Sequence, residues 1–105
     1  VRAVVLANTT SGYPAEAQAG WAQRIEGIRQ SGLEGIVDGA LQRWFHEGFR
    51  ADQPATVALW RERVLACDPA GYIACCEMLS TLDLRDLLPK ITAKTLVIAG
   101  RHDGS

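Results

Sequence analysis

The sequence has few cysteines and no long apolar run, and each shortage excludes a class of protein. The three cysteines, Cys67, Cys75 and Cys76, are odd in number and lack C-x-x-C spacing, which argues against a disulfide framework or a zinc site. We interpret them as small buried residues on a helix in a reducing compartment. No run approaches the roughly eighteen apolar residues of a membrane span, and no segment has a signal-peptide pattern. These features predict a soluble, cytoplasmic protein with no membrane partner.

Charge of either sign is also not in excess. The 11 Lys and Arg residues face 12 Asp and Glu residues, so the net charge is −1. This balance leaves no electrostatic footprint for nucleic acid, and we expect no nucleic-acid partner. The two histidines are His46 and His102, and nothing in the spacing places either beside a cysteine. A cysteine nucleophile is therefore not expected, and His46 is read as a helix cap or surface residue.

Two apolar runs lie at opposite ends of the 105-residue chain. Val1 to Ala7 and the segment from Thr95 to Gly100 are rich in β-branched residues and stop at polar or glycine residues, which is typical of strands buried on both faces. In a parallel sheet, the carboxyl ends of such strands open into the crevice where ligands bind. Asp103, just past the Gly100 turn, is thus a candidate for chemistry. The alternative is that Asp103, followed by Gly104, is an ordinary turn residue.

The segment between the two strands has helical periodicity and several capping signals. An amphipathic pattern begins at Ala15 and ends near Ser31, and the sequence Ser31-Gly32-Leu33-Glu34 has the form of a capping box for a second helix. That second helix carries the apolar stripe Ile36, Val37, Ala40, Leu41, Trp44 and Phe45. The second helix is followed by a break from Gly48 to Asp52. Pro54 then indicates the start of a third helix, Asp68-Pro69 the start of a fourth, and Asp83 a short helical turn.

The predicted order is strand, four or five short helices, strand. So much helix far exceeds what a crossover between parallel strands needs. Two strands do not form a stable sheet unaided, so we expect further strands from a complete protein. Trp21 and Trp60 are interpreted as core residues.

Particular residues resemble a known family. One group of residues resembles the part of α/β-hydrolases that leads from the helical cap into the strand bearing the acid of the Ser-Asp-His triad: Asp83-Leu84-Arg85, Leu88, Ile91 and the run from Thr95 to Asp103. The run Val4 to Thr9 resembles the strand before the cap. Three segments resemble the cap of 3-oxoadipate enol-lactonases: Trp21 to Ile25, Arg43 to Phe45, and Gly71 to Cys76.

The resemblance implies a fold and an activity. It implies a fragment of an α/β-hydrolase in which residues 1–12 form a core strand and loop, 13–90 the cap, and 91–105 a core strand and acid-bearing loop. It implies a small-molecule lactone or ester as substrate, serine-dependent ring opening in aromatic-compound breakdown, and no metal or organic cofactor. Asp103 would hold the triad histidine in the right tautomer. The chain departs from the pattern because it contains no G-x-S-x-G, His102 does not fill the histidine position, and Lys94 stands where relatives usually have Pro. We therefore expect the fragment itself to be inactive.

The resemblance also points to substrate contacts. Caps of this family line the substrate pocket, so Trp44 could press against the lactone while Arg43 attracts its carboxylate. Core packing explains Trp44 equally well, and Arg43 alone fits a solvated surface residue. Two rivals remain open. One is another capped hydrolase, such as an esterase or a carbon–carbon bond hydrolase. An Asp in place of the central serine of G-x-S-x-G in the complete protein would instead suggest a dehalogenase. The other is a helical module that self-associates through its apolar faces and strand edges without catalysis.

Overall fold

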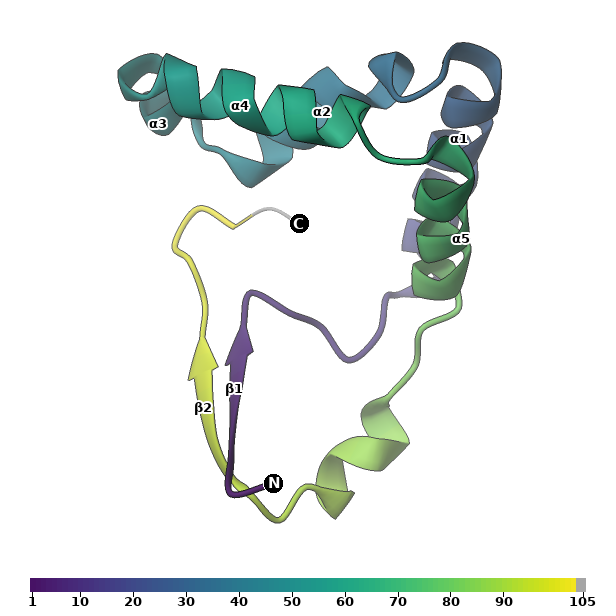
Figure 1. Cartoon of the computed structure of the whole chain (residues 1–105). Coiled ribbons are helices and arrows are strands. Elements are labelled where there is room, and N and C mark those ends of the chain that lie inside the picture. Colours follow the sequence, from purple (N-terminus) through teal and green to yellow (C-terminus); the bar gives the residue numbers. More distant parts are fainter. Residues whose placement is uncertain (104–105) are drawn as a thin grey trace.

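A run of helices lies between two strands along the chain in the computed structural model, which describes residues 1–103 (Figure 1). In chain order the elements are β1 (Ala3–Ala7), α1 (Ala15–Ser31), α2 (Glu34–Trp44), α3 (Glu47–Asp52), α4 (Pro54–Leu65), α5 (Pro69–Ser80), the 3₁₀ helix η1 (Arg85–Lys90) and β2 (Lys94–Ile98). The predicted order of a strand, four or five short helices and a second strand is confirmed, and α3 is a further short helix that was not predicted.

The two strands pair in parallel although the whole helical segment separates them in sequence. Ala3 lies opposite Lys94 and Ala7 opposite Ile98, so the strands are in register along their full length. Both point toward the layer formed by α2, α3 and α4 (Figure 1). Their carboxyl ends therefore face the helices, which is the edge where parallel sheets place ligand sites.

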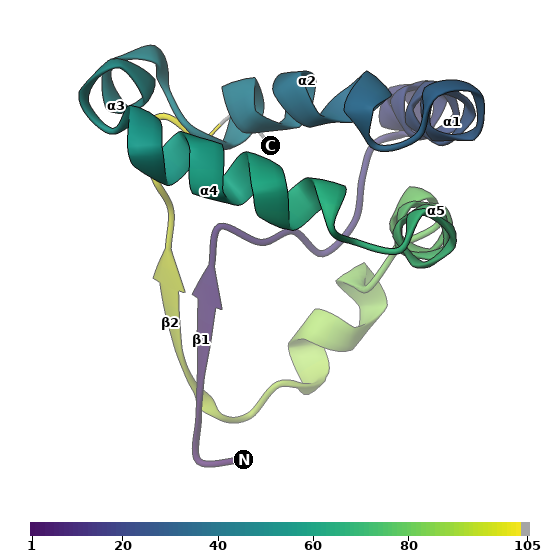
Figure 2. The same cartoon turned by 45° about the horizontal axis from the view of Figure 1, so that its top comes forward.

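The prediction that both strands are buried is wrong for this chain. All five residues of β2 are exposed, and Val5 and Val97 expose 60% and 70% of their surface. The physical reason is that a parallel sheet is normally packed against other elements on both faces. Among residues 1–103, α2, α3 and α4 lie beyond the carboxyl ends of the strands and α1 and α5 lie to one side, so none of them covers the sheet (Figures 1 and 2). The apolar sequence of the strands suits a larger sheet.

The helix boundaries follow local signals, with two corrections. Asp68 caps α5 by accepting a hydrogen bond from the Gly71 amide at 2.8 Å, as expected. The capping box at Ser31 does not form, because Ser31 is still inside α1 and Leu33 precedes α2 without a side-chain cap.

The second correction concerns the segment between α2 and α4. The predicted break from Gly48 to Asp52 is instead α3, which begins after His46. His46 is a cap, as predicted, because its Nδ1 accepts a hydrogen bond from the Phe49 amide at 3.3 Å.

The hydrophobic core lies entirely within the helices. Val37 and Leu41 of α2 pack against Val64 of α4, and partly buried side chains surround them: Phe45, Val57, Leu65 and Tyr72. Figure 2 shows α4 beside α2 and α5 beside α1, and these helix pairs are in contact. Packing of the apolar faces of neighbouring helices therefore holds this part of the chain together.

Several residues expected in the core lie elsewhere. Trp60 exposes 40% of its surface, with the Arg63 guanidinium 5.0 Å from its ring centre. Trp21 is only partly buried. Of the cysteines, Cys76 is buried whereas Cys67 and Cys75 are exposed, and Cys67 follows α4 rather than lying on a helix, so the expectation of three buried helical thiols holds for one of them.

The radius of gyration also indicates an open arrangement. It is 15.8 Å, whereas a compact domain of this length has a value of about 13 Å. The division into residues 1–12, 13–90 and 91–105 stays a prediction. No helix within residues 1–103 combines the length and apolarity needed to cross a bilayer.

Candidate functional site at the strand ends and the helical groove

Asp103 lies where the carboxyl end of β2 approaches the helices. After Ile98 the chain turns, and the Asp103 amide donates a hydrogen bond to the Gly100 carbonyl oxygen at 3.2 Å. Asp103 is exposed. It thus occupies the place in the fold that the sequence predicts for a functional acid. It is also part of a turn, as the alternative holds, although Gly104 of the Asp-Gly pair lies outside the described residues.

A histidine pair joins the acid-bearing loop to the helices. The ring centres of His102 and His46 are 4.9 Å apart, with the rings tilted by 48°. His46 caps α3, so His102, the residue beside Asp103, is in contact with the start of α3. The helical layer and the carboxyl end of β2 therefore adjoin each other, which the sequence alone did not reveal.

Asn8 is a further residue at this edge, and the sequence analysis gave it no functional role. It follows β1 directly and has a positive φ of 46°. Its side-chain oxygen accepts a hydrogen bond from the Gly100 amide at 2.7 Å. Asparagine is one of the few non-glycine residues that adopt this backbone region readily, and that preference is the signal that could have marked the position.

Arg43 and Trp44 lie in a large groove formed by α1, α2 and α5. Its volume is about 1290 Å³, ample for a small molecule. The side chains with rings or charge that line it are Tyr13, Trp21, Arg24, Arg43, Trp44, Asp68 and Tyr72. Trp44 exposes 45% of its surface, so it is not a core residue. Asp103 is not among the described residues that line the groove.

Arg24 is the groove residue that sequence reasoning missed. Its guanidinium lies 4.6 Å from the centre of the Trp21 ring, and Tyr13 meets the same ring edge-on at 5.3 Å. Arg24 follows Trp21 by three residues and so shares its helix face. The spacing was visible in the sequence, but only the packing of α1 against α2 and α5 brings Arg24 near Arg43.

The two arginines give the groove a positive electrostatic character. The pKa of Arg43 lies below its ordinary value because burial withdraws the guanidinium from water and because the charge of Arg24 repels it. Tyr72, on the same wall, has a raised pKa, chiefly through burial. The salt bridges found in the described part of the chain involve other arginines. An aromatic groove with two like charges close together is suited to an anion.

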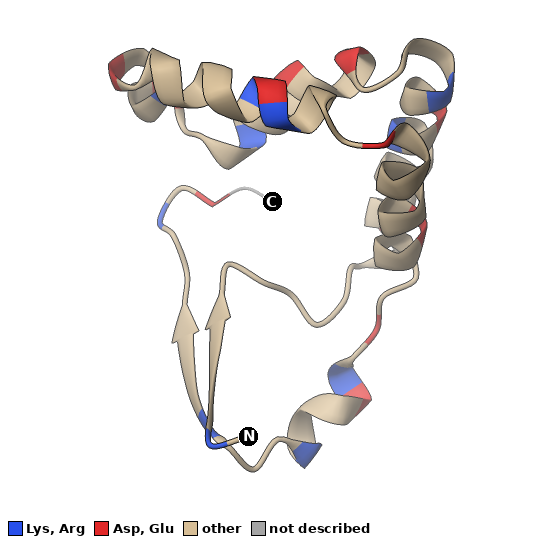
Figure 3. Ribbon diagram, viewed as in Figure 1, with Lys and Arg blue, Asp and Glu red and all other residues tan. Residues whose placement is uncertain are grey.

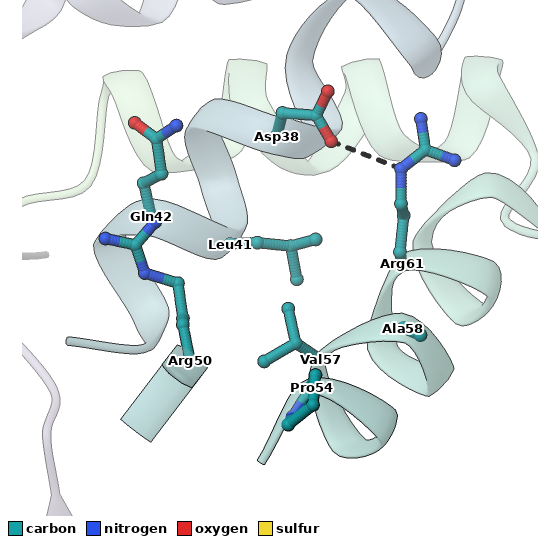
Figure 4. Close-up of a pocket in the computed structure, with 8 residues that line it drawn as sticks. All are labelled: Asp38, Leu41, Gln42, Arg50, Pro54, Val57, Ala58 and Arg61. Atoms are coloured by element: carbon teal, nitrogen blue, oxygen red, sulfur yellow. Dashed lines mark hydrogen bonds and ion pairs between the residues drawn. The ribbon is translucent and has the colours of Figure 1, made fainter. Parts of the chain in front are cut away.

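A second, smaller hollow lies between α2, α3 and α4 and differs in character. It has a volume of about 490 Å³, and Leu41 and Val57 form an apolar patch in it. Asp38 and Arg61 form an ion pair at 3.2 Å on one side (Figure 4). Figure 3 shows charged residues scattered over the helices, whereas the strands carry charge only near their amino-terminal ends. The groove with Arg24 and Arg43 is thus the better candidate for ligand binding.

Comparison with known proteins gives consistent results. The 3-oxoadipate enol-lactonase 2 of Acinetobacter baylyi is 39% identical over 100 residues, which are 95% of this chain and 37% of the relative. The 3-oxoadipate enol-lactonase 1 of the same organism is 36% identical over 87 residues, covering 80% of this chain and 32% of that relative. The sequence matches no model of a protein family.

A solved structure has the same fold. The enol-lactonase from Burkholderia xenovorans LB400 superposes with a TM-score of 0.88 at 31% identity, covering 97% of this chain and 38% of the other. The chain therefore spans about a third of the length of these relatives. The resemblance inferred from the sequence and the predicted fold class are confirmed.

Proposed function

We propose that this chain, which is homologous to a segment of the 3-oxoadipate enol-lactonases and has their α/β-hydrolase fold, supplies the cap and the acid-bearing loop of a lactone hydrolase. The observation that carries this proposal is that three proteins named enol-lactonases match 95%, 80% and 97% of this chain. The substrate class is a small enol-lactone that bears a carboxylate.

The proposed chemistry uses Asp103 through a histidine. A serine hydroxyl supplied by another segment attacks the lactone carbonyl while the triad histidine takes its proton. The ring C–O bond breaks, the histidine returns the proton to the leaving enolate oxygen, and the enol becomes a ketone. Water then cleaves the acyl-enzyme to give the carboxylate. Asp103 holds the histidine tautomer and stabilises the imidazolium.

The groove supplies the proposed substrate contacts. Arg43 and Arg24 attract the carboxylate of the lactone, and Trp44 and Trp21 contact its ring. The sequence contains no G-x-S-x-G segment, so we propose that another segment supplies the nucleophile and the base, and that the chain alone does not turn over the lactone. The free thiols fit a cytoplasmic location.

Hydrolysis by a protein of the relatives' full length tests the proposal. We expect Asp103→Asn to lower kcat by about 10⁴-fold, the order found when a triad acid is made neutral. Asp86→Asn is the matched control, because Asp86 is an exposed carboxylate on η1, toward the opposite end of the strands. Equal activity of the Asp103 variant and its control would make Asp103 a turn residue only. Cleavage of other esters but not of the lactone would favour a different capped hydrolase, such as an esterase.

Self-association is the second candidate for the isolated chain. The apolar side chains exposed on the strands include Val5, Leu96, Val97 and Ile98. Open strand edges next to such side chains favour pairing between copies. Light scattering tests this, and a monomer at working concentration would exclude it.

A further inference from the structure

Asn8 holds the end of β2 with both its backbone and its side chain. Its amide donates a hydrogen bond to the Ile98 carbonyl oxygen at 2.9 Å, which extends the pairing of β1 with β2 by one residue. Its side-chain oxygen then accepts from the Gly100 amide at 2.7 Å. Two hydrogen bonds from one residue therefore fix the path of the chain as it leaves the strand.

The second of these bonds leads directly to Asp103. The N–H of Gly100 donates to the Asn8 side-chain oxygen. The carbonyl oxygen of the same residue accepts a hydrogen bond from the Asp103 amide at 3.2 Å. Gly100 thus stands between Asn8 and Asp103 in a short chain of hydrogen bonds. Movement of the Gly100 amide would turn the whole loop and displace the carboxylate.

The space around Gly100 supports the same arrangement. A Cβ atom placed there would lie 3.5 Å from Asn8 Nδ2 and 3.7 Å from the Asp103 Cβ. The side-chain amide of Asn8 and the side chain of Asp103 therefore both lie beside the Gly100 Cα. Asn8 itself has a left-handed backbone, with φ of 46°.

We propose that Asn8 is a positioning residue for catalysis, whose side-chain amide orients the loop that carries Asp103. This inference rests on the proposed function, in which Asp103 is the triad acid. Asn8 acts only through that acid, since it contacts the loop backbone and has no place in bond making. A carboxylate set at the wrong angle orients its histidine poorly, and misplacement by about 1 Å costs on the order of a hundredfold in rate.

The test is a double-mutant cycle in a protein of the relatives' full length. Asn8→Gly removes the acceptor but tolerates the positive φ, and we expect kcat to fall by roughly tenfold to a hundredfold with little change in KM. Thr10→Ala is the matched control, because within residues 1–103 the Thr10 hydroxyl makes its hydrogen bonds in the same loop, to Gly12. In an Asp103→Asn background, Asn8→Gly should cost nothing more, since its target is already gone.

The pH profile separates positioning from simple stability. The Asp103 carboxylate raises the pKa of the triad histidine by stabilising the imidazolium. In Asn8→Gly this effect weakens, so the acidic limb of kcat/KM should move to lower pH. An Asn8→Gly variant with the same loss in both backgrounds, or with unchanged kcat and an unmoved limb, overturns the proposal.

The role of Asn8 can be tested even if the protein does not cleave the lactone. If the protein cleaves p-nitrophenyl acetate but not the lactone, the cycle is measured with that ester and the same outcomes decide. Hydrogen exchange at the Gly100 amide gives a result without any turnover. Exchange should be faster in Asn8→Gly and unchanged in Thr10→Ala, and slow exchange in both variants overturns the proposal.

Discussion

Removing one positive charge from the groove should weaken binding of the carboxylated lactone by a predictable amount. Arg43→Met keeps the length and apolar stem of the side chain but deletes the guanidinium. A hydrogen bond to a charged group contributes about 1.5–3 kcal/mol. The groove is open to solvent and Arg43 itself is exposed, so the lower end of that range applies. The dissociation constant of the lactone should therefore rise on the order of tenfold.

Steady-state kinetics on a protein of full length tests this. KM for the lactone should rise in Arg43→Met and in Arg24→Met, with kcat changed much less, because the carboxylate is held equally in the ground and transition states. Arg63→Met is the matched control, since Arg63 lies over the Trp60 ring much as Arg24 lies over Trp21 but outside the groove. A lactone whose carboxylate is esterified should bind equally to all forms. A similar loss for the neutral ester, or no difference between Arg43→Met and Arg63→Met, would refute the electrostatic role.

Two further predictions concern stability, each measured on the 105-residue chain. Val37→Ala removes two carbon atoms with their hydrogens from a fully buried side chain, so it should lower the free energy of unfolding, measured in urea, by about 2–3 kcal/mol. The control Val97→Ala, at a site 70% exposed, should lower it by less than about 0.5 kcal/mol. The hydrogen bonds from Arg85 lower the pKa of Asp83 to about 2, so the stabilisation they give is present above the unfolded pKa of about 4 and is lost as pH falls toward 2. Melting temperatures of the chain and of Asp83→Asn should therefore differ at neutral pH and converge near pH 2, and a constant difference would contradict this reading.

Local signals in the sequence were enough to place most elements. The helix that starts at Asp68-Pro69 and the one that starts at Pro54 were predicted because a cap or a proline fixes the backbone at one position, whatever the rest of the chain does. Where two helices meet closely, those signals compete. Gly32, with φ of 67°, ends α1 immediately before α2, so Ser31 stays in the first helix and does not cap the second.

Burial was predicted less well because it depends on what lies around an element. The strands have sequences that suit the middle of a sheet, yet within residues 1–103 only one partner strand is beside each of them. Trp60 has an apolar ring, but its helix packs on α2 through Val64. The groove is a similar case, since Arg24 and Arg43 come together only through the packing of α1, α2 and α5.

The arrangement divides the proposed catalytic work in a definite way. In the proposed enzyme, the arginines and aromatic rings of the helical groove bind the substrate, and Asn8, Gly100 and Asp103 at the strand ends orient the triad histidine. Neither group forms or breaks a bond to substrate, because a carboxylate that acts through a histidine contributes only when that histidine and a nucleophile are in place. Binding and turnover should therefore be separable: the groove can hold a carboxylated ligand in the isolated chain, whereas hydrolysis requires the segment that carries the serine. If the groove were merely a gap between helices, the two like-charged guanidinium groups near each other would have no ligand to offset their repulsion.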